Sequence, residues 1–279
     1  MALQQPRIKL NDGKTIPQLG FGVWQVPVET TAAVVTEALK TGYLSIDTAE
    51  GYQNEKGVGD AIHASGIDRD SLFITSKLRN GGHARDLALK AFDQTMAELQ
   101  LEVLDLFLIH WPVPQQDKYV EAWKTLVELK DAGRIRSIGV SNFNADHLDR
   151  IIGETGTVPV VNQVELHPNF QQRRLREACK KHNIIIESWS PLGQGSAIKA
   201  PVIAAIAKKH GRTPAQVIIR WHLQEGLIVI PKTVTPSRIH ENFDVFGFVL
   251  DADDLKKIAA LDDPKGKIGP DPSVANFTF

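Results

Sequence analysis

Four polar residues lie at or just beyond the ends of short apolar segments of this sequence. Asp47 and Tyr52 occur in SIDTAEGYQNE, Lys77 in LFITSKLRN and His110 in DLFLIHWP. A phenol beside an ammonium group and an imidazole is a proton donor for a carbonyl oxygen. A free tyrosine has a pKa of about 10, and we expect Lys77, held ionised by Asp47, to lower it. His110 then either orients the carbonyl or shares the proton.

Each of these residues has a plainer explanation when it is taken alone. A tyrosine at a strand end usually packs, a lysine is usually solvated, and a histidine is usually a satisfied hydrogen-bonding group. Their occurrence on three successive predicted strands favours the chemical interpretation, and the sequence offers no obvious nucleophile or metal cluster in its place. We therefore predict no metal site.

Alternating strands and helices must position these side chains. Short apolar segments predict strands, and 3.6-residue periodicity predicts helices between them, including 30–42, 86–99, 119–133 and 212–226. The strands are expected at 19–24, 43–49, 72–78, 105–111, 137–143, 160–166, 184–190 and 227–233. A hairpin is expected before them, because RIKL and KTIP flank Asn11-Asp12-Gly13.

Eight strands in alternation with helices predict an α/β fold, a (β/α)8 TIM barrel with an N-terminal β-hairpin. A doubly wound sheet is the alternative. The first strand is not followed by G-x-G-x-x-G, and polar residues follow nearly every strand rather than one switch point. The barrel is therefore favoured, as one domain over residues 1–279.

Composition excludes several classes of protein. The 32 Lys and Arg residues nearly match the 33 Asp and Glu, which argues against a general nucleic-acid binder. No apolar stretch approaches a membrane span, and the N-terminus lacks the apolar core of a secretory signal. Cys179 is the single cysteine, and it is expected to be a small helix residue rather than a reactive thiol. We expect a cytoplasmic protein.

Eight segments of the sequence resemble the aldo-keto reductase superfamily, most of all bacterial 2,5-diketo-D-gluconate reductases and related short-tailed members. The segments are LNDGKTIPQLGFGVWQ, SIDTAEGYQNEKGVG, LFITSKL, DLFLIHWP, IRSIGVSNF, VNQVELHP, ESWSPLGQG and IPKTVTPSRIHEN. The resemblance implies a monomeric NADP-dependent oxidoreductase that reduces aldehydes, ketones, dicarbonyls or keto-sugar acids such as 2,5-diketo-D-gluconate to alcohols. It also implies that Asp47, Tyr52, Lys77 and His110 form a catalytic tetrad with Tyr52 as proton donor.

Carbonyl reduction needs a hydride, which a cofactor must supply. Ser141, Asn142 and Gln163 can hydrogen-bond a carboxamide, and Trp189 can stack on an aromatic ring; in the family, matching residues hold nicotinamide. Lys232, Thr233 and Arg238 surround a strand-to-helix junction suited to an anion. The resemblance assigns that junction to the 2′-phosphate of NADPH, so NADPH is expected rather than NADH. The full set expected to contact the cofactor is Gly22, Val23, Trp24, Ser141, Asn142, Gln163, Trp189, Ser190, Leu192, Gln194, Gly195, Lys232, Thr233, Val234, Arg238, Glu241 and Asn242.

The expected substrate pocket departs from the family at one position. The family often has Lys-Leu-Trp-Asn where this chain has Lys77-Leu78-Arg79-Asn80. Arg79 either binds an acidic or phosphorylated substrate, pairs with an internal carboxylate such as Glu50, or points to solvent. Trp24, Trp111, Phe277 and Phe279 are expected to give the pocket an apolar lining.

Two other functions compete with carbonyl reduction. Lys77 at a barrel strand end can instead form a Schiff base with a carbonyl, as in a lyase. The same barrel can also serve as a cofactor-binding sensor or structural protein with little turnover, because a fold does not fix a function. The cofactor motifs argue against the first alternative, and an assay of turnover tests the second.

Overall fold

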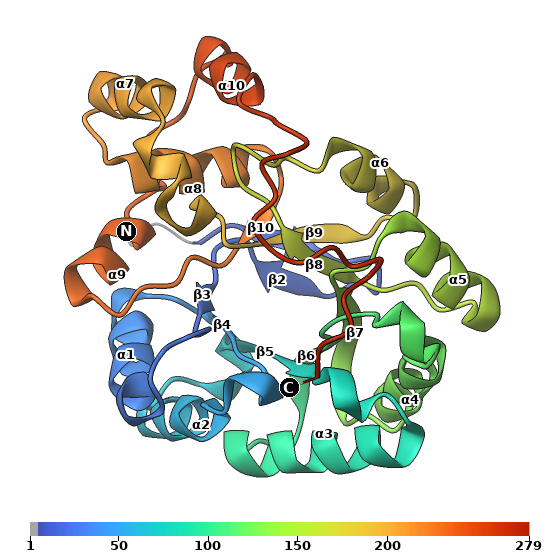
Figure 1. Cartoon of the computed structure of the whole chain (residues 1–279). Coiled ribbons are helices and arrows are strands. Elements are labelled where there is room, and N and C mark those ends of the chain that lie inside the picture. The colour runs from blue at the N-terminus through green and yellow to red at the C-terminus, as the bar shows by residue number, and fades with distance from the viewer. Residues whose placement is uncertain (1–4, 279) are drawn as a thin grey trace.

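The computed structural model describes residues 5–278, which form a hairpin followed by a parallel barrel (Figure 1). The hairpin consists of the antiparallel strands β1 (Arg7–Lys9) and β2 (Thr15–Pro17), joined by the predicted turn at Gly13. The barrel strands are β3 (Phe21–Gly22), β4 (Ser45–Asp47), β5 (Phe73–Leu78), β6 (Leu104–Ile109), β7 (Ile135–Ser141), β8 (Val161–Glu165), β9 (Ile185–Trp189) and β10 (Ile228–Val229).

The eight barrel strands are parallel and lie in sequence order from β3 to β10. Backbone hydrogen bonds close the ring between its first and last strands. Gly20 N donates to Val229 O at 2.9 Å, and Val229 N donates to Gln18 O at 3.0 Å. This closure confirms the predicted (β/α)8 barrel and excludes the doubly wound sheet, in which the outer strands do not pair.

Ten α-helices of the described chain surround the strands, and apolar side chains fill the layer between helices and strands (Figure 1). Local sequence determines where these helices begin and end. Gly42 ends the helix Val28–Thr41 in a left-handed conformation, and Thr213 caps the start of the helix Pro214–Gln224, which has Pro214 in its first turn. The helices are α1 (Val28–Thr41), α2 (Glu55–Ala64), α3 (Arg85–Leu99), α4 (Tyr119–Asp131), α5 (Ala145–Thr155), α6 (Arg173–Lys181), α7 (Pro201–His210), α8 (Pro214–Gln224), α9 (Pro236–Phe243) and α10 (Ala252–Ala259).

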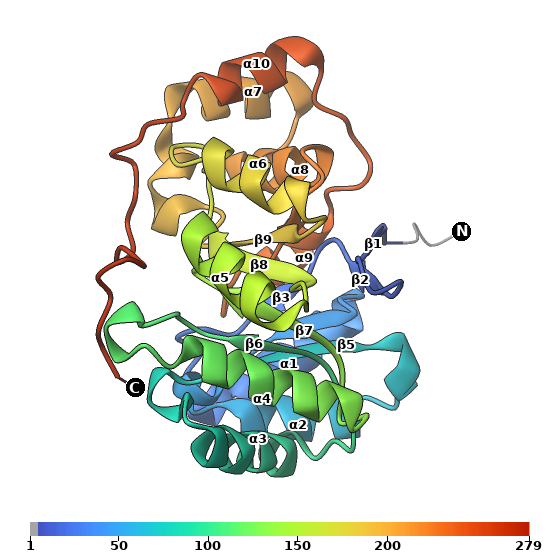
Figure 2. The ribbon, with the colours of Figure 1, turned by 90° about the vertical axis from the view of Figure 1, so that its right-hand side faces the viewer.

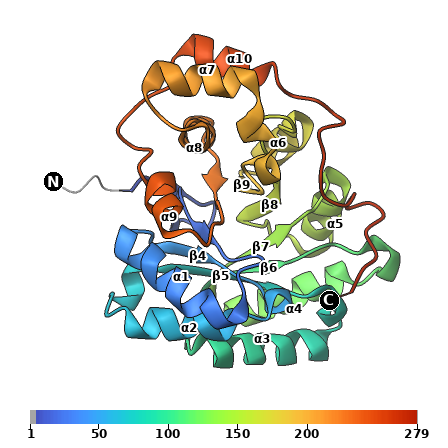
Figure 3. The same ribbon diagram turned by 60° about the vertical axis from the view of Figure 1, so that its left-hand side comes forward.

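The predicted elements are confirmed, although several strands are shorter than their apolar segments. The segment at 19–24 gives only Phe21–Gly22, and 227–233 gives only Ile228–Val229. Apolar residues that flank these two strands, such as Leu19, Val23, Leu227 and Ile230, are still buried, whereas Trp24 is exposed. Helix α9, which forms the second half of the cofactor motif, lies beside α1 (Figure 3). His240 Nδ1 of α9 lies 3.2 Å from the hydroxyl of Thr41 in α1.

The hairpin plugs one end of the barrel. Leu10 and Ile16 pack with Leu106, Leu108 and other residues that point into the barrel interior. In Figure 2 the hairpin lies on one side of the strands, and the C-terminal segment crosses the opposite side. The plugged end is the one at which the strands begin, so the end at which they finish remains for a site.

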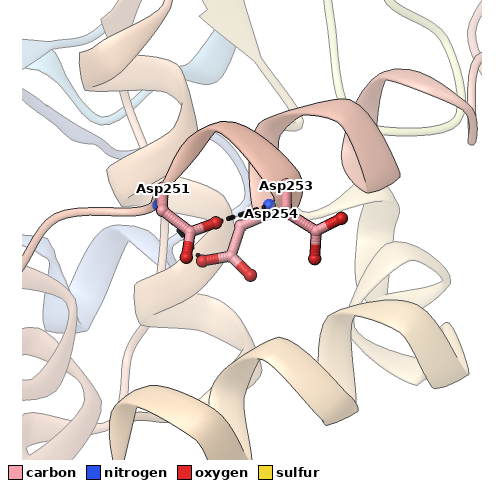
Figure 4. A group of neighbouring side chains, drawn as sticks. All are labelled: Asp251, Asp253 and Asp254. Atoms are coloured by element: carbon pink, nitrogen blue, oxygen red, sulfur yellow. Dashed lines mark hydrogen bonds between the residues drawn. The ribbon is translucent and has the colours of Figure 1, made fainter.

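Three neighbouring carboxylates at the start of α10 have a structural explanation. Asp251 accepts a hydrogen bond from the backbone amide of Asp254 (3.0 Å), and Asp254 accepts one from the amide of Asp251 (3.2 Å), as Figure 4 shows. Lys209 on α7 pairs with both carboxylates, at 2.6 and 2.9 Å. The group with Asp253 therefore caps α10 and ties it to α7. Within residues 5–278, no helix is long and apolar enough to cross a membrane.

Candidate active site

The four predicted catalytic residues come together where the strands end. Asp47 ends β4, Lys77 lies in β5 and His110 follows β6, while Tyr52 ends a short 3₁₀ helix over Glu50–Tyr52. The Nζ atom of Lys77 lies 2.6 Å from Asp47 Oδ1 and 3.4 Å from the Tyr52 hydroxyl. The Tyr52 and His110 rings meet edge to face, with centroids 5.6 Å apart. The ends of three neighbouring parallel strands and the 3₁₀ helix after β4 thus bring all four groups together.

Lys77 is fully buried, and its charge is held in place by three oxygens. Its ammonium donates to Asp47 Oδ1, to the Thr48 carbonyl at 2.9 Å and to the Tyr52 hydroxyl. Burial alone lowers the pKa of Lys77, but the charges of Asp47 and Tyr52 outweigh burial, and the pKa is raised. The ammonium is therefore charged throughout the physiological range. A lysine held in this state is a poor amine nucleophile, which argues against the Schiff-base alternative.

The expected lowering of the pKa of Tyr52 does not occur in this state of the protein. Burial raises the pKa of the hydroxyl, the charge of Lys77 opposes that rise, and the charge of Asp47 adds to it. The net shift is upward, because removing the phenol from water costs the phenolate more than Lys77 returns. Tyr52 is therefore firmly protonated at neutral pH, as a proton donor must be before it reacts.

His110 is neutral at physiological pH. Burial and the nearby charge of Lys77 together hold its pKa well below the usual value. Asn142 Nδ2 donates to the His110 backbone carbonyl at 2.9 Å, which fixes the chain at this position. A neutral imidazole beside Tyr52 can donate one N–H to a carbonyl oxygen without competing with the phenol for the proton.

A cavity of about 730 Å³ opens directly above these residues. Trp24, Trp111 and Phe277 give it apolar walls, and the Trp111 and Phe277 rings meet edge to face with centroids 5.2 Å apart. Phe279, which was expected to join them, lies outside the described residues. The predicted residues that line the cavity are Gly22, Trp24, Asp47, Tyr52, His110, Trp111, Ser141, Asn142, Gln163, Trp189, Ser190, Leu192, Gln194 and Lys232.

The residues expected to hold nicotinamide form a connected network on one side of the cavity. The Trp189 indole nitrogen donates to Asn142 Oδ1 at 2.9 Å, and Asn142 Nδ2 donates to Ser141 Oγ at 3.0 Å. The Ser141 hydroxyl donates in turn to the Gln163 carbonyl at 2.8 Å. The indole plane of Trp189 is thereby fixed beside the amide groups, which suits a ring that carries a carboxamide.

The second cofactor motif extends from the cavity to the start of α9. Lys232 lines the cavity and its Nζ atom donates to the Gln25 carbonyl at 3.1 Å. Thr233 is buried, and its hydroxyl accepts from the Thr235 amide. Several other predicted cofactor contacts do not line the cavity. They are the buried Val23, Gly195 in the loop after β9, and Val234, Arg238, Glu241 and Asn242 at and around the start of α9.

Arg79 does not line the cavity, contrary to its assignment to the substrate pocket. Its side chain is half exposed, and its Nε atom lies 3.1 Å from Glu50 Oε1. Of the three alternatives that the sequence left open, the structure favours the internal carboxylate. This ion pair links Arg79 to the 3₁₀ helix that carries Tyr52.

Arg79→Trp will therefore change turnover of acidic and neutral carbonyls by the same factor. The exposed pair with Glu50 is worth up to about 1 kcal/mol, so the variant will also keep nearly its full stability. Kinetics on a matched pair of acidic and neutral substrates check this. Arg85→Trp is the control, because Arg85 is a similarly exposed arginine paired with Glu128. A selective loss on the acidic substrate would restore the substrate-anion role.

Two features of the site were missed in the sequence. One is Glu187, a buried carboxyl of β9 that reaches the Gln163 amide. The other is the first part of the C-terminal tail, before the predicted Phe277, where Ile268, Gly269 and Pro270 line the cavity. The signal for Glu187 was a lone charged residue inside the apolar segment IIIESWS, two residues before Trp189. The tail has no periodic pattern that could have revealed it.

A buried carboxylate fastens this tail to the barrel. Glu165, the last residue of β8, accepts hydrogen bonds from the amides of Ile268 (2.6 Å) and Gly269 (2.7 Å), and from His167 Nε2 (3.1 Å). Burial alone raises the pKa of Glu165, but these bonds outweigh burial and lower it. A side chain at Gly269 would meet the Trp189 ring at 2.5 Å, so glycine allows the tail to lie against the indole.

Comparison with known proteins identifies the family. Residues 18–263 match the Aldo/keto reductase family. The chain belongs to this family. That assignment agrees with the barrel, with the four residues at its open end and with the resemblance of the sequence motifs.

Proteins similar to this aldo/keto reductase match it along nearly its whole length. The "Aldo-keto reductase" of Mycolicibacterium smegmatis is 54% identical over 273 residues, covering 98% of this chain and 99% of that protein. The "Methylglyoxal reductase DkgA" of Escherichia coli (strain K12) is 54% identical over 267 residues, covering 95% and 96%. Crystal structures of Gox0644, as the apo form and as a variant in complex with NADPH, are 55% identical with TM-scores of 0.95, covering 99% of this chain and 100% of that chain.

Proposed function

We propose that this aldo/keto reductase reduces carbonyl groups with NADPH and that Tyr52 is its proton donor. The observation that carries the proposal is the placement of the Lys77 ammonium, which bridges Asp47 and the Tyr52 hydroxyl on the floor of the cavity. The NADPH complex of Gox0644 and the name of the E. coli relative support the cofactor and the reaction.

The residues have distinct parts in the reaction. NADPH, when bound, supplies the hydride that reaches the carbonyl carbon. The neutral imidazole of His110 orients the carbonyl oxygen, and the Tyr52 hydroxyl gives that oxygen its proton. The phenolate left behind is stabilised by the Lys77 ammonium at 3.4 Å until solvent returns a proton. Asp47 holds Lys77 in place, because its carboxylate is the strongest acceptor near the ammonium.

The donors of the cavity fit a nicotinamide cofactor. The side chains of Ser141, Asn142 and Gln163 would hold the carboxamide, and Trp189 would stack on the ring. At the other end, Lys232 and Arg238 would hold the 2′-phosphate near the first turn of α9, where backbone N–H groups are free of intrahelical partners. A preference for NADPH over NADH follows from this pair of cations.

Arg238→Ala will weaken NADPH binding and leave NADH binding nearly unchanged, because NADH has no 2′-phosphate. The loss of a charge-assisted contact is worth about 1.5–3 kcal/mol, or roughly ten- to a hundredfold in Kd. Titration by quenching of tryptophan fluorescence measures both cofactors. Arg220→Ala is the control, because Arg220 lies on the neighbouring helix α8 and bonds Gln224 and the Val245 carbonyl. Equal weakening of both cofactors would contradict the assignment.

The substrate class proposed is a small aldehyde, ketone or dicarbonyl, with α-dicarbonyls such as methylglyoxal first and keto-sugar acids next. The names of the DkgA relatives support the α-dicarbonyls. The aromatic walls of the cavity suit an uncharged reactant, and Arg79 offers no cation to an acidic one.

NADPH consumption at neutral pH with a panel of dicarbonyls, simple aldehydes and a keto-sugar acid tests the function. Turnover of at least one class supports the reductase, and the order of kcat/KM values ranks the substrate classes. Tight NADPH binding without turnover on every member would instead favour a cofactor-binding sensor. Absence of NADPH binding would overturn the cofactor assignment.

We further infer that residues 1–279 act as one barrel domain, as a monomer in the cytoplasm. The closure of the ring between Gly20 and Val229 supports a single barrel domain. The single cysteine, Cys179, is buried and unpaired, which is typical of proteins in a reducing compartment. Burial raises the pKa of the Cys179 thiol to about 11, so the thiol is unreactive. Light scattering on the eluted protein measures the mass in solution.

A further inference from the structure

Glu187 is a buried acid that the proposed reaction does not use. It lies in β9 two residues before Trp189, so both side chains are on the same side of the strand. Only 1% of the residue is exposed. An acidic residue in such a position needs partners, because a buried carboxyl without them costs stability.

A single nitrogen connects Glu187 to the tetrad. Gln163 Nε2 lies 2.7 Å from Asp47 Oδ2 and 2.8 Å from Glu187 Oε2. This nitrogen carries two hydrogens, so each carboxyl receives one of them. The other oxygen of Asp47 accepts from Lys77. A continuous line of contacts therefore runs from Glu187 through Gln163 and Asp47 to Lys77.

The charges along this line balance only when Glu187 is protonated. Asp47 and Lys77 cancel one another, and an ionised Glu187 would add an unmatched negative charge beside Asp47. Glu187 Oε1 is buried and has no hydrogen-bond partner among the described residues. Burial and the charge of Asp47 raise the pKa of Glu187 to about 8, against the Gln163 bond and the charge of Lys77, which lower it.

We propose that Glu187 is a positioning residue for the proton donor and that it works in its protonated form. By accepting one hydrogen of Gln163 Nε2, it turns the other hydrogen onto Asp47, and Asp47 in turn holds the Lys77 ammonium at Tyr52. This inference rests on the proposed function, since Tyr52 must be the proton donor. Ionisation of Glu187 sets two carboxylates against each other across one amide and loosens that alignment.

Activity is therefore expected to decline as the pH rises through about 8, the pKa of Glu187. The groups that face Glu187 are Asp47 from β4, Lys77 from β5, Gln163 from β8 and Tyr52 from the 3₁₀ helix. Lys77 and Tyr52 both have raised pKa values and Gln163 does not titrate, so these three groups do not account for a decline near pH 8.

Two substitutions test the proposal through kcat and its pH profile. Glu187→Leu will lower kcat at pH 7 about tenfold to a hundredfold, since displaced catalytic groups commonly cost that much, and will abolish the decline near pH 8. Glu187→Gln, which keeps an acceptor for Gln163 but cannot ionise, will restore most of that kcat and will also lack the decline.

Glu55→Gln is the matched control: Glu55 is another buried acid, with its pKa raised to about 7, but it bonds Ser76 and Thr95 away from the cavity. It will leave kcat and the decline near pH 8 unchanged.

The outcomes separate this inference from the proposed function. A parent that reduces no carbonyl counts against the function. A parent that turns over, with a folded Glu187→Leu variant equal to it in kcat and pH profile, overturns the inference. So does a folded Glu187→Gln variant as impaired as Glu187→Leu, because the acid itself would then be required.

If both variants misfold, infrared titration of the carboxyl-labelled Glu55→Gln protein decides: loss of a protonated glutamic acid band near pH 8 supports the inference, and absence of that band overturns it.

Discussion

Tyr52→Phe will lower kcat for carbonyl reduction by about a hundredfold or more, since general-acid catalysis by a positioned side chain contributes 10²–10⁴-fold. The expected loss is large because no other described group replaces the phenol: His110 is neutral and Lys77 is buried beneath the hydroxyl. NADPH affinity will remain, because Tyr52 is not among the residues that would hold the cofactor. Single-turnover kinetics with preloaded NADPH measure the loss of the chemical step.

The chain supplies its own controls for this variant. It has three tyrosines, and the other two, Tyr43 and Tyr119, lie outside the cavity. The Tyr43 hydroxyl donates to the Ile239 carbonyl, and the Tyr119 hydroxyl contacts Arg150. Phenylalanine at either position will leave kcat unchanged. A Tyr52→Phe variant that keeps the parent's kcat would show that another group delivers the proton.

Lys77→Met will both inactivate and destabilise the protein. Removing one partner of a buried ion pair commonly costs about 3–5 kcal/mol, because the remaining charge is left uncompensated. Here that charge is Asp47, which would keep only the Gln163 hydrogen bond. Since the folded pKa of Lys77 is raised, the contribution of its charge to stability is fully present at neutral pH and is lost only as the pH rises through the folded pKa. Urea unfolding at neutral pH measures the loss.

A double-mutant cycle separates stability from catalysis at this pair. Asp47→Asn with Lys77→Met removes both charges, so the double variant will be more stable than Lys77→Met alone. Its activity will stay as low, because no cation remains to stabilise the Tyr52 phenolate. A double variant that loses the sum of the two single losses would mean that the charges do not stabilise one another.

Sequence patterns were sufficient for the barrel and for most of the residues on the floor of the candidate site. Short apolar segments mark strands whose ends must meet in a parallel barrel, so Asp47, Lys77 and His110 could be placed together from their positions alone. Tyr52 was assigned with them although it lies beyond its strand, in a 3₁₀ turn that the apolar pattern does not specify. Its motif, rather than its periodicity, identified it.

Quantities that depend on several elements at once could not be predicted in this way. The net upward shift in the pKa of Tyr52 is a balance between burial and the charges on β4 and β5, and the sequence shows only the charges. Likewise, pairing with Glu50 was one of three alternatives for Arg79, and only the folded backbone brings the two side chains to 3.1 Å. Glu187 was read as part of an apolar strand, because its partner Gln163 lies on a different strand.

The tail held by Glu165 separates part of the cavity wall from the residues proposed to react. The tetrad lies on β4, β5, β6 and the 3₁₀ turn, whereas Ile268 to Pro270 form part of the cavity wall without belonging to the strand framework. Because Glu165 binds backbone amides, substitutions in the tail other than at Gly269 can alter which molecules enter the cavity and leave the anchor and the proposed catalytic residues intact. Related proteins with this barrel can therefore differ in substrate specificity and keep the same reacting residues. A laboratory selection that randomises only the tail would use the same separation.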